Sequence, residues 1–309
     1  MTQPIEVLDK LVREMVREQR SRRRFKYLMW IGTLAVISTT LAVEHFTSDG
    51  ADAKEITARI DVSGPIAEGE AASAESLKKS IGQAFADTRT KAVVLKINSP
   101  GGSPVQAGYV YDEIKRQRGL HTNIKVFAVI TDLGASGAYY IASAADEIYA
   151  DKASLVGSIG VTAASFGYVG VMEKLGVERR AYTAGEHKAF LDPFQPRNAD
   201  ETAFWGEVLR TTHNQFIEAV KAGRGDRLKS ADHPELLSGL IWSGQQAQQL
   251  GLIDKLGDVD YVAREVVGAS KVVDFSTKDN PIDRFAKRIG TSVAQELSMS
   301  LGFSGQSLR

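Results

Sequence analysis

Two loops of small residues in this sequence each follow an apolar run, and each carries groups suited to acyl transfer. The first is Gly134–Ala138, in which Ser136 stands at a turn with only glycine and alanine beside it. A hydroxyl at such a turn is accessible, and the free N–H groups at the start of a following helix can stabilise an oxyanion. The alternative is that Ser136 only caps that helix, a common role of serine.

The second loop, residues 98–104, reads Asn-Ser-Pro-Gly-Gly-Ser-Pro. Gly101 and Gly102 lack a Cβ and can turn their N–H groups toward one point. A phosphate-binding loop is disfavoured, because the glycine spacing fits neither GxGxxG nor GxxxxGK[ST]. Ligands of open parallel sheets bind at the carboxyl edge. We therefore expect the two loops to face each other there, although a tight turn that requires positive φ explains the glycines equally well.

A serine nucleophile needs a base, and of the five histidines only His187 lies in a segment with possible catalytic character. Lys188 follows it directly. A lysine accepts a proton only when its amine is neutral, which near neutral pH requires desolvation. The apolar residues that follow are expected to form a wall around Lys188: Ala189, Phe190, Leu191 and Phe194. An ordinary surface lysine is the alternative.

The elements that must position these loops alternate between apolar strands and helices. This order predicts an α/β domain built from βαβ units with a mostly parallel sheet. Strands are expected at 56–62, 92–97, 124–130 and 147–150. Helices are expected at 74–86, 105–118, 138–145, 171–175, 198–222, 243–250 and 259–267, and a weaker amphipathic tail at 280–301.

The N-terminal part indicates a membrane anchor. Residues 27–43 contain no charged side chain, and a helix of that length spans about 25 Å. Residues 1–26 carry eight basic and four acidic side chains, with a cluster just before the apolar run. Positive charge on the cytoplasmic side predicts a single span with the N-terminus inside and the remaining chain outside. A cleaved signal peptide is the alternative.

The expected organisation is a cytoplasmic basic segment (1–26), a transmembrane anchor (27–43), a tether (44–55), a catalytic domain (56–275) and a C-terminal tail (276–309).

The amino-acid composition excludes several kinds of site. The absence of cysteine excludes disulfides, thiolate metal sites and a cysteine nucleophile. Equal numbers of basic and acidic residues give no indication of a charged partner. We expect no cofactor, no metal and no nucleic acid.

Four motifs together resemble the signal peptide peptidase A (protease IV) family, over about residues 56–270. They are NSPGG, GASGAYYIASAADEIYA, LVGSIGV and AGEHK, in the order and approximate spacing of that family. The resemblance implies a ClpP/crotonase-like fold and a serine–lysine dyad, with Ser136 as nucleophile and Lys188 as general base. It also implies that Ser158 orients the lysine. The oxyanion donors would be the N–H groups of Gly137 and of Gly101 or Gly102.

This resemblance also implies a context for the reaction. One subunit would supply both residues of the dyad, subunits would form a homo-oligomeric ring at the inner membrane, and hydrophobic peptides such as remnant signal peptides would be cleaved outside the cytoplasm. Many members have two glycines after the serine, whereas this chain has Gly137-Ala138. The alternatives are a SohB-type peptidase, a crotonase-like enzyme acting on acyl-CoA and a non-catalytic ring scaffold.

Overall fold

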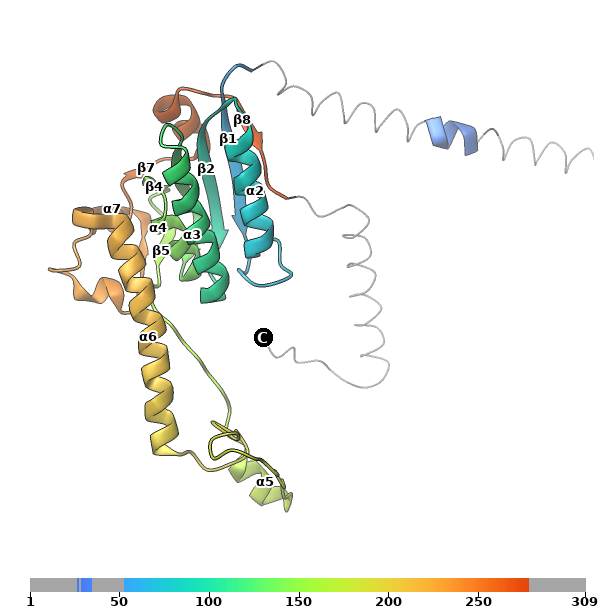
Figure 1. The fold of residues 1–309 in the computed structure, drawn as a ribbon, viewed down its shortest axis with the longest axis vertical. Coiled ribbons are helices and arrows are strands. Elements are labelled where there is room, and N and C mark those ends of the chain that lie inside the picture. The colour runs from blue at the N-terminus through green and yellow to red at the C-terminus, as the bar shows by residue number, and fades with distance from the viewer. Residues whose placement is uncertain (1–26, 28, 35–52, 278–309) are drawn as a thin grey trace, which may run out of the picture. The chain divides into compact units, whose positions relative to one another are not determined.

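The computed structural model describes residues 27, 29–34 and 53–277 (Figure 1). The chain divides into two units, Met1–Lys54 and Glu55–Arg309, which are described separately. In the first unit, residues 27 and 29–34 are helical. Within the described residues, no helix is both long and apolar enough to cross a membrane. The predicted basic segment, and most of the predicted anchor, tether and tail, lie outside the described residues.

An eight-stranded sheet forms the centre of the second unit, counted over its described residues. Strands β8, β1, β2 and β3 are neighbours in that order and run parallel. The long β3 pairs with β4 along its first part and with β5 along its last part. β7 is parallel to β4, and β6 is antiparallel to β5. The bounds are β1 Ile56–Ser63, β2 Thr90–Ser99, β3 Lys125–Ala135, β4 Glu147–Ala150, β5 Leu155–Gly157, β6 Ile241–Ser243, β7 Lys255–Leu256 and β8 Val272–Asp274.

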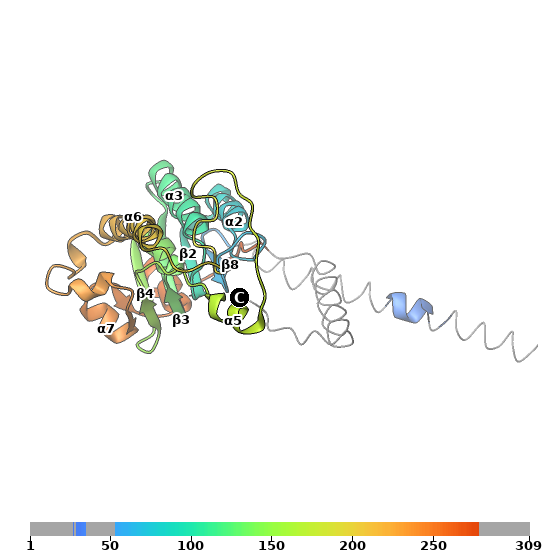
Figure 2. The same cartoon turned by 90° about the horizontal axis from the view of Figure 1, so that it is seen from below.

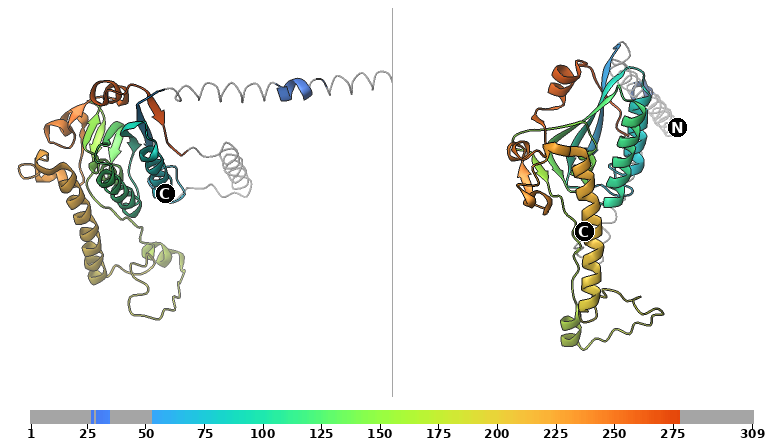
Figure 3. Two further views of the ribbon diagram at one scale, coloured as in Figure 1. Left: turned by 45° about the horizontal axis from the view of Figure 1, so that its top comes forward. Right: turned by 60° about the vertical axis from the view of Figure 1, so that its left-hand side comes forward.

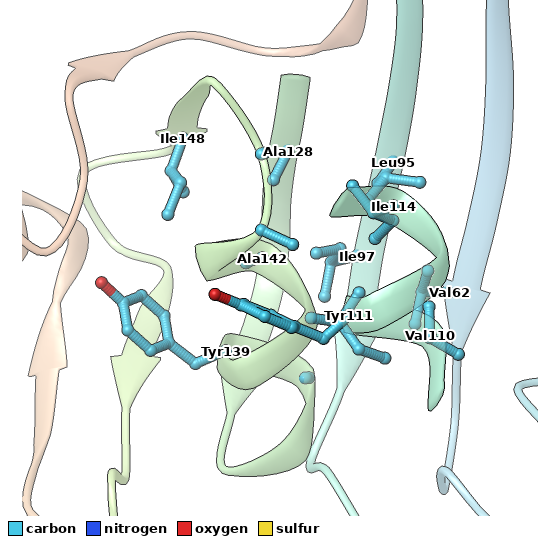
Figure 4. Close-up of a cluster of buried hydrophobic side chains, with 14 of the residues drawn as sticks. Val62, Leu95, Ile97, Val110, Tyr111, Ile114, Ala128, Tyr139, Ala142 and Ile148 are labelled. Carbon is cyan, nitrogen blue, oxygen red and sulfur yellow. The ribbon is translucent and has the colours of Figure 1, made fainter. Parts of the chain in front are cut away.

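Both faces of the sheet are covered, as the alternation of side chains along β2 shows. Val93 and Leu95 point into the larger buried cluster, and Val94 between them points into a smaller one with Val262. Strands buried on both faces need nearly continuous apolar sequence, which β2 has at residues 92–95 and β3 at residues 126–130. Figure 4 shows part of the larger cluster, in which the ring of Tyr111 lies among aliphatic side chains of the helices and strands.

Helices cover the larger cluster on one face, where α2 and α3 lie side by side (Figure 2). Side chains at the helix starts accept hydrogen bonds from backbone N–H groups, as Ser73, Ser103 and Asn198 do. The other face is covered by α8 and the π-helix η4. The bounds are α2 Ala74–Ala86, α3 Pro104–Leu120, α4 Gly137–Ser143, α5 Val169–Leu175, α6 Ala199–Arg224, α7 Gly244–Gln249, α8 Val259–Tyr261 and η4 Val262–Val267, with short 3₁₀ turns η2 Gly225–Arg227 and η3 Pro234–Leu237.

Residues 163–211 project from the rest of this unit and are called the arm. It comprises an irregular chain, α5 and the N-terminal half of α6 (Figures 1 and 3). The buried residues of α6 all belong to its C-terminal half, beginning at Phe216. The arm has many exposed apolar side chains: Phe166, Val171, Leu175, Val177, Tyr182 and Phe204. A surface of this kind is typical of a segment that contacts another molecule.

The predicted α/β class and the parallel sheet are confirmed. The helix over 74–86 and the strand over 147–150 have their predicted bounds, and the other predicted elements differ by a few residues at their ends. β5, β6, β7 and β8 were not predicted. Each has only two or three residues, so none carries enough periodicity to be recognised. The predicted helix over 259–267 is instead a short α-turn continued by a π-helix.

Candidate functional site

Ser136 lies between β3, which ends at Ala135, and α4, which begins at Gly137. Its φ is 53° and its ψ is −125°, a conformation that L-residues rarely adopt. Two backbone hydrogen bonds hold it there: its N–H donates to the backbone oxygen of Gly157 at 2.9 Å, and its backbone oxygen accepts from the N–H of Tyr140 at 3.0 Å. The side chain makes no capping hydrogen bond, so the helix-cap alternative does not explain this serine.

The glycine loop follows β2 and is held from two sides. The N–H of Gly101 donates to the buried hydroxyl of Ser99 at 3.1 Å, and the oxygen of Gly101 accepts from the N–H of Ile66 at 2.9 Å. Because a trans peptide points its C=O and N–H in opposite directions, the N–H of Gly102 faces away from Ile66. Of the two predicted alternatives, only Gly102 therefore has an N–H that is free to act as a donor, since that of Gly101 already has a partner.

The two loops touch at the carboxyl edge of the sheet. A Cβ added to Gly101 would lie 2.7 Å from the Ala135 oxygen, the Gly137 nitrogen and the Ser136 Cβ. A Cβ added to Gly137 would lie 3.4 Å from the nitrogen of Gly102. The backbone oxygen of Ser136 points into the helix, where it accepts from the N–H of Tyr140. The N–H of Gly137 belongs to the same trans peptide and therefore points away from the helix. Within the described residues, the N–H groups of Gly102 and Gly137 have no hydrogen-bond acceptor, so each is free to donate to a substrate oxygen.

A cleft of about 510 Å³ opens beside these loops. Ser136 and Ser158 both line it, and Tyr140 and Phe216 form an aromatic wall with ring centroids 4.9 Å apart. Burial raises the pKa of Tyr140, the one titratable side chain among the lining residues that the structure describes. The lining contains no lysine, histidine or carboxylate: Pro100, Gly102, Pro104, Ser136, Gly137, Tyr140, Ser158, Gly160, Val161, Thr162, Thr212, Phe216, Ser238 and Gly239.

Ser158 follows β5 and also has positive φ, 52°. Its N–H donates to the oxygen of Leu240 at 2.7 Å. Gly157, just before it, supplies the oxygen that binds the N–H of Ser136. The chain around Ser158 is therefore bonded directly to the chain around Ser136, and the two hydroxyls share one cleft.

Lys188 is on the arm and does not line this cleft. Its side chain is exposed, and its N–H donates to the oxygen of Gly185 at 3.2 Å. The predicted apolar wall does not enclose it: Phe190 packs against Phe204 and Trp205, with centroids 5.7 and 6.1 Å apart. The physical reason is that the aromatic side chains of the arm pair with one another. A single chain thus gathers Ser136, Ser158, Gly102 and Gly137, and leaves Lys188 apart.

Three residues of this region were not found by sequence reasoning. Ser99 fixes the glycine loop, and its place at the end of a strand was a weak signal. Phe216 forms the wall with Tyr140 from the distant helix α6, and no local pattern indicates that pairing. His213 on α6 binds the oxygen of Ile159 through Nε2 at 2.9 Å. Elsewhere in the described residues, no group of three His, Asp or Glu side chains is close enough to hold a metal ion.

The sequence of this chain is similar to those of known proteins. The model of Peptidase family S49 matches residues 118–272, half of the chain, which include Ser136, Ser158 and Lys188. A Brucella abortus protein named "Na(+)/H(+) antiporter NhaA" is 48% identical over 186 residues, which are 60% of this chain and 25% of that protein. An Enterococcus faecium protein named "Putative signal peptide peptidase SppA" is 32% identical over 171 residues, which are 55% of this chain and 48% of that protein.

Among solved structures, a membrane-bound stomatin-specific protease matches with a TM-score of 0.47 and 14% identity, over 73% of this chain and 100% of that one. This chain spans a quarter of the Brucella protein and about half of the Enterococcus protein. The match to the family model runs from the end of α3 to the start of β8, so it covers the elements on both sides of Ser136 and begins after the glycine loop. The chain belongs to peptidase family S49.

Proposed function

We propose that this chain is a serine peptidase in which Ser136 is the nucleophile. The observation that carries this proposal is the arrangement of Ser136 at positive φ beside the N–H groups of Gly137 and Gly102, which have no partner in the described part of the chain. Such a strained turn presents the hydroxyl toward a substrate, and N–H donors beside it stabilise the charge that develops on the carbonyl oxygen. Membership of family S49 supports the same activity.

The base must come from outside the cleft, because none of the described lining residues is a lysine, a histidine or a carboxylate. We propose that Lys188 of a second copy of this chain supplies it, delivered by the arm. The exposed apolar side chains of the arm support this, since packing against a second copy would remove them from water. This differs from the expectation that one subunit supplies both residues of the dyad.

In the proposed reaction, the Oγ of Ser136 attacks the carbonyl carbon while the neutral amine of Lys188 takes the hydroxyl proton. The carbonyl oxygen becomes negative and accepts hydrogen bonds from Gly137 and Gly102. The ammonium of Lys188 then gives its proton to the departing amine, which leaves an acyl ester on Ser136. A water that Lys188 deprotonates hydrolyses the ester and restores the serine. Ser158 would accept a hydrogen bond from one N–H of the Lys188 amine and so orient the lone pair of the amine toward Ser136.

The substrate that suits this cleft is an extended apolar peptide. Tyr140 and Phe216 form an apolar wall, and no described lining residue carries a full charge at neutral pH. Burial of an apolar side chain there contributes about 25 cal/mol per Å². Remnant signal peptides fit this description, and one relative is named as a signal peptide peptidase. A SohB-type peptidase with other peptide substrates is the alternative within the same chemistry.

We further propose that residues 27–43 anchor the chain in the inner membrane with the domain outside the cytoplasm. The uncharged run and the preceding basic cluster support this orientation. Protease added to spheroplasts is expected to digest the domain after residue 53 and to spare an epitope placed at the N-terminus. Protection of the domain would refute the orientation and would favour a cytoplasmic acyl-CoA enzyme.

A fluorophosphonate probe tests the activity directly, because it labels only an activated serine. The full chain in detergent is expected to be labelled at Ser136, and labelling is expected to disappear in Ser136→Ala. Hydrolysis of a fluorogenic apolar peptide should disappear in the same variant. A chain that is folded but is neither labelled nor able to cleave peptides would be a non-catalytic scaffold.

A mixing experiment tests where Lys188 acts. Ser136→Ala and Lys188→Ala chains are each expected to be inactive. If neighbouring copies share a site, an equal mixture reassembled from dissociated chains recovers about a quarter of the wild-type activity, because one site in four unites both intact residues at random. If one chain supplies both residues, the mixture stays inactive.

A further inference from the structure

His213 lies where α6 reaches the main part of its unit, three residues before the first buried residue of that helix, Phe216. Its Nε2 is 2.9 Å from the backbone oxygen of Ile159. A carbonyl oxygen can only accept, so Nε2 carries the hydrogen in this contact. The proton on this nitrogen is therefore committed to Ile159, and Nε2 is not available as a base for a serine.

The contact acts on the segment that carries Ser158. This segment, residues 157–160, is called the strap. It is held at three successive residues. The backbone oxygen of Gly157 accepts from the N–H of Ser136, and the N–H of Ser158 donates to the oxygen of Leu240. The backbone oxygen of Ile159 accepts from His213. Ser158 has positive φ, and a residue in that conformation persists only when its surroundings fix it. His213 is the one side chain among these three holding groups.

The same contact joins the two ends of the arm. The chain leaves the strap at Gly160 and enters the arm at residue 163, and it returns along α6 to His213. Because Lys188 is carried by this arm, the bond between His213 and Ile159 links the part of the chain that bears the lysine to the part that bears Ser158. A change at His213 would therefore affect both groups that the proposed reaction must bring together.

We propose that His213 is a positioning residue for the peptidase reaction. By donating from Nε2 to the oxygen of Ile159, it fixes the strap and the base of the arm in one geometry, so that Ser158 can orient the incoming amine of Lys188. This proposal rests on the proposed function, because it assigns His213 an effect on turnover through Ser158. It assigns His213 no contact with the substrate.

The test is a double-mutant cycle between His213 and Ser158 on the full chain in detergent, read as kcat and KM for a fluorogenic apolar peptide. His213→Ala is expected to lower kcat about tenfold with little change in KM, the effect of losing one hydrogen bond. In the Ser158→Ala background, the same change is expected to lower kcat less than about twofold. His213→Gln is expected to recover most of the activity, because its amide nitrogen can donate to the same oxygen.

Gln215→Ala is the matched control, an exposed change two residues away on the same helix, and it is expected to behave as wild type. A wild-type kcat in His213→Ala would overturn the proposal. So would an equal loss in both Ser158 backgrounds, since that pattern indicates general damage to the fold. If His213→Ala does not fold, the comparison of His213→Gln with His213→Leu in the two backgrounds decides in the same way. Failure of the proposed function is distinct, because wild type itself would then cleave no peptide.

Discussion

Replacing Gly101 by alanine would test whether the contact between the two loops builds the oxyanion site. Gly101 has φ of 91°, and its added Cβ would lie 2.7 Å from three atoms of the nucleophile turn. Positive φ costs an L-residue about 1–2 kcal/mol, and overpacking costs about 1–3 kcal/mol. We expect the free energy of unfolding to fall by about 2–4 kcal/mol, which lowers Tm by about 10 °C for a domain of this size.

The catalytic effect of Gly101→Ala is expected to exceed its effect on stability. Two of the crowded atoms are backbone atoms and the third is the Cβ of Ser136, so none of them can rotate away and the glycine loop must move back from Ser136. That movement carries the N–H of Gly102 out of reach of the substrate oxygen, and loss of one such donor costs about 100-fold to 1000-fold in kcat. The donor acts on the transition state, so kcat and kcat/KM should fall together. The assay is hydrolysis of a fluorogenic apolar peptide at a temperature well below the variant's Tm.

Gly108→Ala provides the matched control. Gly108 lies in the α3 helix, and nothing lies within 4 Å of its added Cβ. Alanine is the better helix former there, so this variant should gain about 0.5–1 kcal/mol of stability and keep its activity. If folded Gly101→Ala cleaves the peptide at the wild-type rate, the contact between the loops does not build the oxyanion site and the role given to Gly102 is wrong.

Three further predictions concern the base and the support of α6. Lys188→Ala and Lys188→Arg should both abolish peptide cleavage in a folded chain, since a guanidinium stays protonated, whereas His187→Ala should remain active; the opposite result would indicate a serine–histidine mechanism. Burial acts to raise the pKa of Asp254, but hydrogen bonds and charge from the fully buried Arg224 outweigh burial and hold that pKa below its ordinary value. The ionised carboxylate of Asp254 therefore stabilises the fold above about pH 4, and this contribution to the free energy of unfolding is lost as the pH falls further. Urea unfolding should show this acid loss in wild type but not in Asp254→Asn, and Arg224→Ala should cost about 3–5 kcal/mol at neutral pH. Gly223→Ala should reduce Tm strongly, because its Cβ would overlap a backbone oxygen of α4, and an unchanged Tm would show that α6 can shift away from α4.

The parts of the fold that sequence could predict are those specified by local patterns. β1 alternates apolar and polar residues, β2 and β3 contain apolar runs at 92–95 and 126–130, and α2 has an N-cap and a clear apolar face. Ser136 and the glycine loop were also predictable, because each combines small residues with the end of a strand. β5 and β8 pair with the long strands β3 and β1, whereas β6 and β7 pair with the short strands β5 and β4, so the signal for these four strands lies in their neighbours and not in their own residues.

The location of Lys188 shows a different limit. Residues around it have apolar character, which predicts burial, but the sequence does not say whether the covering surface belongs to the same chain. In the structure those aromatic side chains pack against one another along the arm, and the lysine stays exposed. His213 was missed for a related reason: its partner is a backbone oxygen 54 residues away, and no side-chain pattern marks a carbonyl group.

Under the proposed mechanism, separation of the nucleophile from its base has a functional consequence. Each chain carries an oxyanion site with a serine and, on its arm, a lysine for a neighbouring site. An isolated copy then has a strained serine with no base beside it, and a lysine that is exposed to water. Packing of an arm against a neighbour would bury its apolar residues and desolvate the lysine in the same step, which is what makes an amine neutral. Assembly and activation of the base would thus be one event, driven by the apolar surface that the single chain leaves exposed.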